Sequence, residues 1–216
     1  MEEYLMRPAA LPTWGQRTAL RLLNLIGWQF HFKPLPGPHG VAVVYPHTSN
    51  LDFPIGLLAK WAVGLQFRWL AKDSLFRGPT GALMLYWGGV AVDRSAPQGA
   101  SKRLAQTMHA SDWFWLVITP EGTRSYRPYW KSGFYRIAQE AGVPVLLIAI
   151  DYGKKVIDVT RSMTLSGDAD ADMAAIARRY EGVQARLPKD AAPVRLAPTA
   201  AGADRDPGHA RAPGSN

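Results

Sequence analysis

The chain has 216 residues, of which 47% are hydrophobic, and this suits one domain with a substantial core rather than two. It contains no cysteine, which excludes disulfides, thiolate metal sites and thiol redox chemistry. The formal net charge of +8 indicates an anionic partner, such as a nucleic acid, a membrane surface or a phosphate-bearing substrate.

The first residues, MEEY, are acidic and do not resemble a secretory signal, so we expect a cytoplasmic protein. Eight tryptophans are more than a core of this size needs. Tryptophan suits a surface that is wet on one side and apolar on the other. Together with the positive charge, this favours peripheral association with a membrane.

Residues 11–32 are predicted to form an amphipathic helix with a broad apolar side. The apolar positions are Trp14, Leu22, Leu25, Ile26 and Trp28, and the polar ones are Arg17, Arg21, Asn24 and Gln29. Two arginines and several amides exclude a membrane-spanning segment. The helix could lie in a membrane interface with its arginines near anionic headgroups, or simply cover the core. Residues 33–40 are rich in proline and glycine and read as a connector, so 1–40 form an N-terminal region.

The following region alternates short apolar runs with helical segments, a pattern typical of an α/β fold. Strands are expected at 41–45, 67–71, 88–92, 113–119, 145–150 and 156–159, and helices at 53–63, 98–110, 132–141 and 168–187. We predict one domain over 41–187. From Pro188 onward, alanine, proline and glycine make up more than half of the residues, so 188–216 is expected to be a disordered tail.

The stretch PHTSNLD, residues 46–52, follows the strand predicted at 41–45. Pro54 suits the first turn of a helix, so the expected geometry is strand, tight loop and helix. Across such a loop, Asp52 can accept a hydrogen bond from the imidazole of His47. This bond fixes the tautomer and leaves the other ring nitrogen free to take a proton. A helix cap at Asp52 beside an ordinary loop histidine explains the stretch equally well.

A second polar stretch, PEGTRS, follows the strand predicted at 113–119. Gly122 permits a positive φ angle and close backbone approach. Thr123 and Arg124 can therefore present a hydroxyl, N–H groups and a guanidinium toward one point, which suits a phosphate. The competing interpretation is a surface ion pair between Arg124 and Glu121.

Two further cations are candidates for the same anion. Arg94 follows the strand predicted to end at residue 92, where α/β proteins gather ligand groups. Lys131 lies on the loop before the helix at 132–141. The sequence contains no phosphate-loop motif and no cluster of histidines that would hold zinc, so no metal site is expected.

These stretches, in this order, resemble the glycerolipid acyltransferases, the family that includes 1-acyl-sn-glycerol-3-phosphate acyltransferase. Residues 47–52 match the HxxxxD motif of that family, 88–94 its second block, 121–124 its third and 143–144 its fourth. The first and third blocks together are the specific part of the match, which covers residues 41–150. Two departures are that Ala91 stands where many members carry a bulky apolar residue and that the fourth block lacks a second proline.

The resemblance implies a single α/β domain with a mostly parallel sheet flanked by helices. It also implies transfer of a fatty acyl group from acyl-CoA or an acyl carrier protein to the hydroxyl of a lysophospholipid, without a cofactor. His47, oriented by Asp52, would act as the general base on the acceptor hydroxyl. Arg124 and Gly122 would bind the acceptor phosphate, and Glu121 would lie near its glycerol-like hydroxyls.

Two rival functions remain compatible with the sequence. A thioesterase would use water in place of the acceptor and would need no anion site. A binding protein for anionic lipid or nucleic acid would need no catalysis. No recognisable nucleic-acid motif occurs in the chain, so no nucleic-acid partner is expected.

Overall fold

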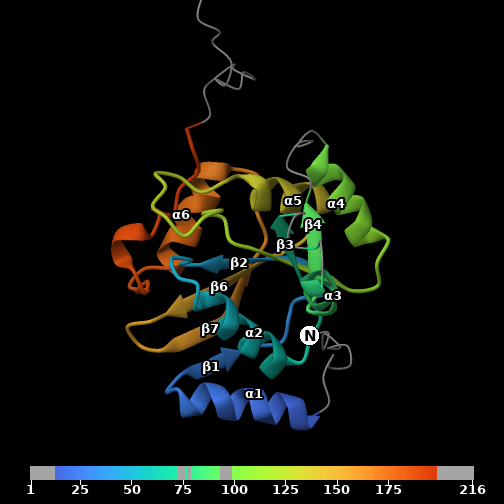
Figure 1. The fold of residues 1–216 in the computed structure, drawn as a ribbon. Coiled ribbons are helices and arrows are strands. Elements are labelled where there is room, and N and C mark those ends of the chain that lie inside the picture. Colours follow the sequence, from blue (N-terminus) through green and yellow to red (C-terminus); the bar gives the residue numbers. More distant parts are fainter. Residues whose placement is uncertain (1–12, 73–75, 77–78, 93–98, 199–216) are drawn as a thin grey trace, which may run out of the picture.

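The computed structural model describes residues 13–72, 76, 79–92 and 99–198, and a seven-stranded sheet lies at its centre (Figure 1). The strands are β1 (Gln29–Phe32), β2 (His39–Tyr45), β3 (Phe67–Lys72), β4 (Gly89–Val92), β5 (Phe114–Ile118), β6 (Val145–Asp151) and β7 (Val156–Met163). Their order is β1-β7-β6-β2-β5-β3-β4, and each pair is parallel except β6 with β7. The prediction of a mostly parallel sheet is confirmed.

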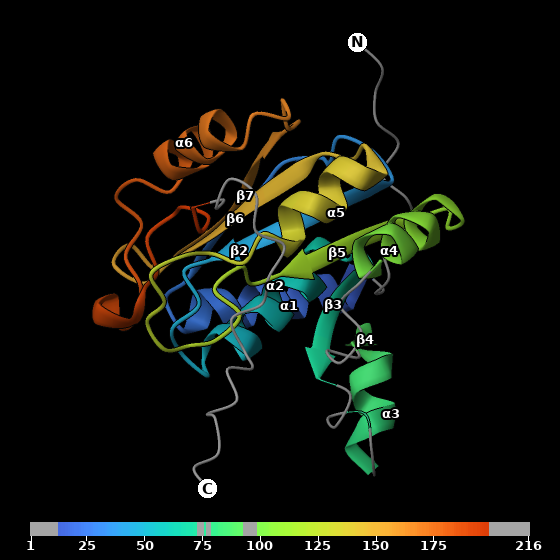
Figure 2. The same cartoon turned by 90° about the horizontal axis from the view of Figure 1, so that it is seen from above.

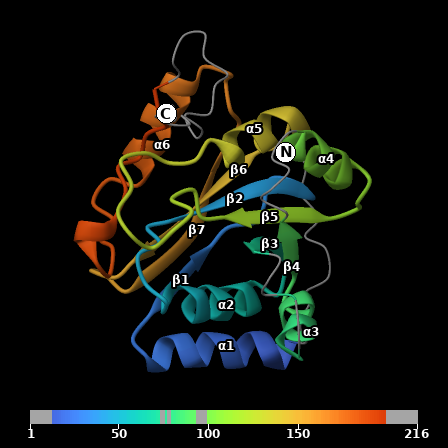
Figure 3. The same cartoon turned by 45° about the horizontal axis from the view of Figure 1, so that its top comes forward.

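Helices cover both faces of this sheet. They are α1 (Thr13–Leu25), α2 (Asp52–Val63), α3 (Pro79–Tyr86), α4 (Ala100–His109), α5 (Gly133–Ala141) and α6 (Ala169–Arg179). α2 lies on one face with α1 outside it, whereas α4, α5 and α6 lie on the other (Figure 3). α3 lies beside β4 at the sheet edge (Figure 2). Among the described residues, no helix has the length and apolarity needed to cross a bilayer.

The central strands are buried on both faces, which explains their continuous apolar sequences. Val41 and Val43 of β2 pack toward α4, α5 and α6 with Phe134, while Ala42 between them packs toward α2 with Ala59. β2 pairs in parallel with β6 on one side and with β5 on the other. The carboxyl ends of β6, β2 and β5 therefore meet at one edge of the sheet, where their loops can form a common site.

The N-terminal helix is shorter than the sequence suggested. α1 ends at Leu25, and residues 29–32 form β1, which pairs in parallel with β7. The prediction of one helix through residue 32 is therefore wrong. Gly27 adopts a φ angle of 80°, a left-handed conformation that commonly ends a helix, and the short edge strand follows it.

Two other boundaries also differ from the prediction. β2 begins at His39, inside the predicted connector. α6 ends at Arg179, eight residues before the expected end, because Tyr180 turns into the core. Its buried hydroxyl donates a hydrogen bond of 2.9 Å to the carbonyl oxygen of Val43. This contact joins the end of α6 to the strand that leads into the catalytic candidates.

The prediction of disorder from Pro188 is wrong for residues 188–198. A 3₁₀ helix spans Pro188–Asp190, and Ala192 is buried. The backbone N–H of Trp130 donates to the carbonyl of Arg195 over 2.8 Å. The sequence of this segment shows no periodic apolar pattern, so its ordered conformation could not be predicted. Hydrogen bonds to distant loops hold the segment in place. Residues 199–216 lie outside the described residues, as do residues 1–12.

Candidate active site

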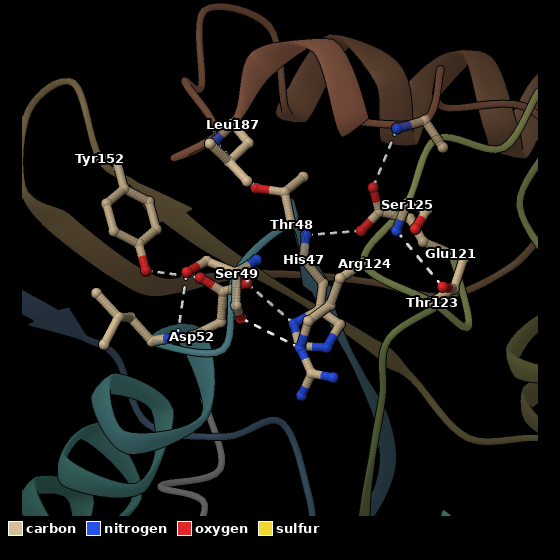
Figure 4. Close-up of polar contacts among 12 residues, drawn as sticks. His47, Thr48, Ser49, Asp52, Glu121, Thr123, Arg124, Ser125, Tyr152 and Leu187 are labelled. Atoms are coloured by element: carbon tan, nitrogen blue, oxygen red, sulfur yellow. Dashed lines mark hydrogen bonds and ion pairs between the residues drawn. The ribbon is translucent and has the colours of Figure 1, made fainter.

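Three loops at the carboxyl ends of neighbouring strands form one polar site (Figure 4). The loop after β2 carries His47 and leads into Asp52, the first residue of α2. The loop after β5 carries Glu121 and Arg124, and Tyr152 directly follows β6. The structure thus brings together the two sequence stretches that were expected to act jointly.

His47 and Asp52 form the centre of the site. The Nδ1 atom of His47 lies 3.1 Å from Oδ2 of Asp52, and the two side chains are 14% and 2% exposed. The ring N–H is not aligned well enough for a hydrogen bond, and no other described residue bonds Nδ1. Such loose alignment is common in free enzymes and tightens when substrate binds. Asp52 is therefore the group that can orient the imidazole.

Asp52 does not cap α2. The cap position is Leu51, and no side-chain cap bond is made. The carboxylate instead accepts the backbone N–H of Ser49 at Oδ2 over 2.9 Å and the hydroxyl of Tyr152 at Oδ1 over 2.6 Å. The helix-cap interpretation of Asp52 is therefore wrong.

These contacts determine the charge of the Asp52 carboxyl. Burial alone raises its pKa, but the neighbouring His47 imidazole and the hydrogen bonds from Tyr152 and Ser49 outweigh burial and hold the pKa below its usual value. Asp52 is thus ionised at neutral pH and can stabilise a protonated imidazole. Burial first, and then the Asp52 charge, raise the pKa of Tyr152, which keeps its hydroxyl protonated as a donor.

Glu121 is fully buried, and both of its carboxylate oxygens accept backbone N–H groups. Its Oε2 accepts the backbone N–H of His47 over 2.6 Å, and its Oε1 accepts the backbone N–H of Ala192 over 3.0 Å. Burial raises the pKa of the carboxyl, and the hydrogen bonds from Ala192 and His47 oppose this rise. Both oxygens are engaged away from Arg124, so the surface-pair interpretation is wrong.

Arg124 lies beside the imidazole at the edge of the site (Figure 4). Its Nε donates to the carbonyl oxygen of Ser49 over 3.3 Å, and no described carboxylate pairs with its guanidinium. Gly122 adopts a φ angle of 67°, and a Cβ atom there would lie 2.7 Å from Cε of Lys131. The positive φ angle strains any residue with a Cβ atom, so the turn favours glycine. Thr123 also lies in the loop, and its Oγ1 accepts the N–H of Ser125 over 3.4 Å.

The other two cations differ in position. The side chain of Lys131 lies against Gly122 and is exposed, outside the cavity that His47 and Asp52 line. Arg94 lies outside the described residues. Within the part of the chain that the structure describes, no three histidine, aspartate or glutamate side chains are grouped so that they could hold a metal ion.

Comparison with known proteins identifies the family. The sequence model of a family described as Acyltransferase matches residues 29–151, more than half of the chain. The chain belongs to the acyltransferase family. This match confirms the resemblance to glycerolipid acyltransferases drawn from the sequence blocks.

A solved structure shares the fold of this acyltransferase. The crystal structure of the 1-acyl-sn-glycerophosphate (LPA) acyltransferase PlsC from Thermotoga maritima matches with a TM-score of 0.52 and 20% sequence identity. The match covers 80% of this chain and 79% of that one. Comparison with curated proteins finds no match.

A cavity of about 370 Å³ extends from the site between α2 and the sheet. Its polar end includes His47, Asp52, Gly122, Thr123 and Arg124. The rest is largely apolar and is lined by, among others, Phe30, Leu57, Val63, Phe67, Ile148, Ile150, Ile157 and Val159. The candidate pair His47 and Asp52 therefore lies where the polar end of the cavity meets its apolar part.

Sequence reasoning missed three contributors to this acyltransferase site, namely Ser49, Tyr152 and Ala192. Ser49 lies inside the recognised stretch, but its role uses backbone groups that any residue carries. Tyr152 lies two residues after the apolar run at 145–150, and this position near a predicted strand end was its only signal in the sequence. Ala192 gave no signal, because it contributes only a backbone N–H from a segment expected to be disordered.

Proposed function

We propose that this acyltransferase moves a fatty acyl group from a thioester donor, acyl-CoA or an acyl carrier protein, to the hydroxyl of a lysophospholipid such as 1-acyl-glycerol-3-phosphate. The observation that carries the proposal is the His47–Asp52 pair at the polar end of an apolar cavity, with the guanidinium of Arg124 beside it. A base, an anion site and an apolar compartment are the three parts that this reaction requires.

His47 acts as the general base in the proposed mechanism. Its Nε2 removes the proton of the acceptor hydroxyl as that oxygen attacks the thioester carbonyl carbon. Asp52 stabilises the imidazolium that forms. The tetrahedral intermediate then breaks its carbon–sulfur bond, and the imidazolium returns the proton to the leaving thiolate. A base of this kind contributes about 10²–10⁴-fold, and positioning and charge stabilisation supply the rest.

Arg124 binds the phosphate of the acceptor. Its Nε is held by the carbonyl of Ser49, so both terminal nitrogens of the guanidinium can donate to phosphate oxygens. The carbonyl belongs to the same loop as His47, and this contact sets the distance between the anion and the base. Gly122 allows the backbone to approach the same group.

The apolar part of the cavity takes an acyl chain. It begins beside His47 and passes under α2 to strands β1 and β7, where Phe30 and Val159 line it. Each methylene group buried there contributes about 0.8 kcal/mol of binding free energy. A chain seated in this cavity places its carbonyl carbon at the polar end, next to the base.

The outer face of α1 supports peripheral membrane binding. Trp14 and Leu25 are 71% and 81% exposed, whereas Leu23 on the opposite face is fully buried. Arg17 and Arg21 are exposed between the two ends of this outer face. Apolar residues interspersed with arginines on one face suit the boundary between anionic headgroups and acyl chains. The proposed location is the cytoplasmic surface of a membrane.

The test is a panel of lysolipid acceptors offered with one labelled acyl donor. We expect labelled diacyl product, fastest with an acceptor that carries a phosphate monoester. Free fatty acid released at one rate with and without every acceptor would overturn the proposal in favour of a thioesterase. Absence of both products with acyl-CoA and with acyl carrier protein would overturn it as well.

A further inference from the structure

Among the described residues, Tyr152 makes the shortest side-chain contact with the Asp52 carboxylate. It lies at the end of β6, on the opposite side of β2 from the Arg124 loop. Its hydroxyl donates to Oδ1 over 2.6 Å. We propose that Tyr152 is a positioning residue for acyl transfer, whose hydroxyl holds Asp52 in the orientation that His47 requires. The inference rests on the proposed function, because it concerns the same catalytic pair.

The two oxygens of Asp52 have different partners. Oδ2 lies 3.1 Å from Nδ1 of His47 and accepts the backbone N–H of Ser49 over 2.9 Å. Oδ1 has Tyr152 as its one hydrogen-bond partner among the described residues. The terminal torsion of an aspartate is broad, so a carboxylate held at one oxygen can rotate about that contact. The second anchor fixes the plane of the carboxylate and thus the direction from Oδ2 to the imidazole.

The tyrosine is itself held in place by two neighbouring segments. Its ring packs edge-on against Trp28, with 4.9 Å between ring centroids. Its backbone N–H donates to the carbonyl of Gln184 over 2.9 Å, and the guanidinium carbon of Arg186 lies 5.8 Å from its ring centroid. These contacts belong to the ring and the backbone, so they persist when only the hydroxyl is removed.

The pKa of Asp52 depends on its hydrogen bond from Tyr152. A change in the pH dependence of activity can therefore distinguish a positioning role of Tyr152 from a purely structural one. The titratable groups that act on Asp52 and Tyr152 are His47, Glu121 and Arg186. Without the Tyr152 hydroxyl, the pKa of Asp52 rises, because one bond that favours the carboxylate is lost. Activity requires ionised Asp52 and an unprotonated imidazole. The acid limb of the pH profile that reports ionisation of Asp52 therefore moves to higher pH.

The experiment compares Tyr152→Phe with a matched control, Tyr135→Phe. The Tyr135 hydroxyl donates to buried Asp172 over 2.8 Å on the other face of the sheet. Removing this hydroxyl should therefore affect the stability of the fold and not the candidate site. We expect Tyr152→Phe to lower kcat about 10- to 100-fold, the rate equivalent of one hydrogen bond to a charged group, with little change in either KM. The acid limb should move to higher pH. The control should melt earlier and keep the wild-type kcat and pH profile.

Wild-type kcat and an unmoved acid limb in Tyr152→Phe would overturn the inference, as would a fall in kcat no larger than that of the control. Carboxyl titration of Asp52 by NMR tests the contact without any activity. An inactive wild type in which Tyr152→Phe still raises the pKa of Asp52 refutes the proposed function and keeps the contact. An active wild type with an unchanged Asp52 titration refutes the role of Tyr152.

A second modification tests the opposite direction if Tyr152→Phe does not fold. Fluorination of Tyr152 makes the hydroxyl a stronger donor and retains the ring contacts. The stronger bond should lower the pKa of Asp52 and move the acid limb to lower pH. A shift to higher pH, or none, in a folded fluorinated protein would overturn the inference.

Discussion

The backbone N–H of His47 donates a hydrogen bond to Oε2 of Glu121, with 2.6 Å between the two atoms, although the residues lie 74 positions apart in the chain. The other oxygen of Glu121 accepts the N–H of Ala192. One buried carboxylate therefore joins the His47 loop, the loop after β5 and the segment around Ala192. From this arrangement we predict that Glu121 positions the His47 loop and does not contact the substrate directly.

Glu121→Gln should reduce both stability and kcat. The amide offers one oxygen to two backbone N–H donors, so one N–H loses its partner at a cost of about 1–3 kcal/mol in the free energy of unfolding. The histidine loop then shifts, and kcat falls while the KM for the acceptor changes little. Denaturant unfolding and steady-state kinetics measure the two effects. A raised acceptor KM with unchanged kcat and stability would instead indicate that Glu121 contacts the substrate.

Arg124→Ala should weaken acceptor binding selectively. Loss of the charge-assisted bonds to phosphate should raise the acceptor KM by about 10- to 100-fold and leave the KM for the thioester donor unchanged. Arg127→Ala is the matched control, because Arg127 is exposed on the same loop and lies outside the cavity. Equal effects of the two substitutions on acceptor KM would contradict the role of Arg124.

Substitution on α1 should separate membrane binding from folding. Deleting the helix would expose core around buried Leu23, so a point change is the cleaner test. Leu25→Glu places a charge on the exposed apolar face and should reduce sedimentation with anionic vesicles while the melting temperature stays unchanged. Tyr126→Glu, at an exposed aromatic residue outside α1, serves as the control. Full vesicle binding by Leu25→Glu would refute the proposed role of this face.

Acid should destabilise the fold partly through Asp172. Burial raises its pKa, but hydrogen bonds from Ser166, Tyr135 and Gly167 outweigh burial and lower it below 3.8. The stability that this shift provides is complete above the ordinary pKa and is lost as pH falls through the lowered value. Asp172→Asn should therefore unfold more easily at pH 7 and show a shallower loss of stability below pH 4. An unchanged slope in urea unfolding across this range would contradict the assignment.

The features that could be predicted are those whose evidence lies within a short stretch of sequence. The apolar runs at 41–45 and 145–150 identified two central strands, because strands buried on both faces must be apolar throughout. His47 and Asp52 were recognisable because both lie within one loop. Arg124 was recognisable because glycine precedes it in a turn after a strand, and the structure places it beside the imidazole.

The remaining features depend on contacts between distant segments. The role of Tyr152 requires that β6 lie beside β2, and strand order has no local signature. The order of residues 188–198 comes from backbone hydrogen bonds to the loops of Glu121 and Trp130, which composition cannot reveal. The expected contact of Glu121 with substrate came from resemblance alone, whereas its buried position follows from packing.

The most direct test of the central claim is acyl transfer by His47→Ala. The backbone N–H of His47, rather than its ring, bonds Glu121, so the variant should fold and melt close to the wild type. Its transfer of labelled acyl groups from thioester to 1-acyl-glycerol-3-phosphate should fall by about 10²–10⁴-fold or more. Asp52→Asn should show a large loss as well. Transfer by folded His47→Ala at a near wild-type rate would contradict the account.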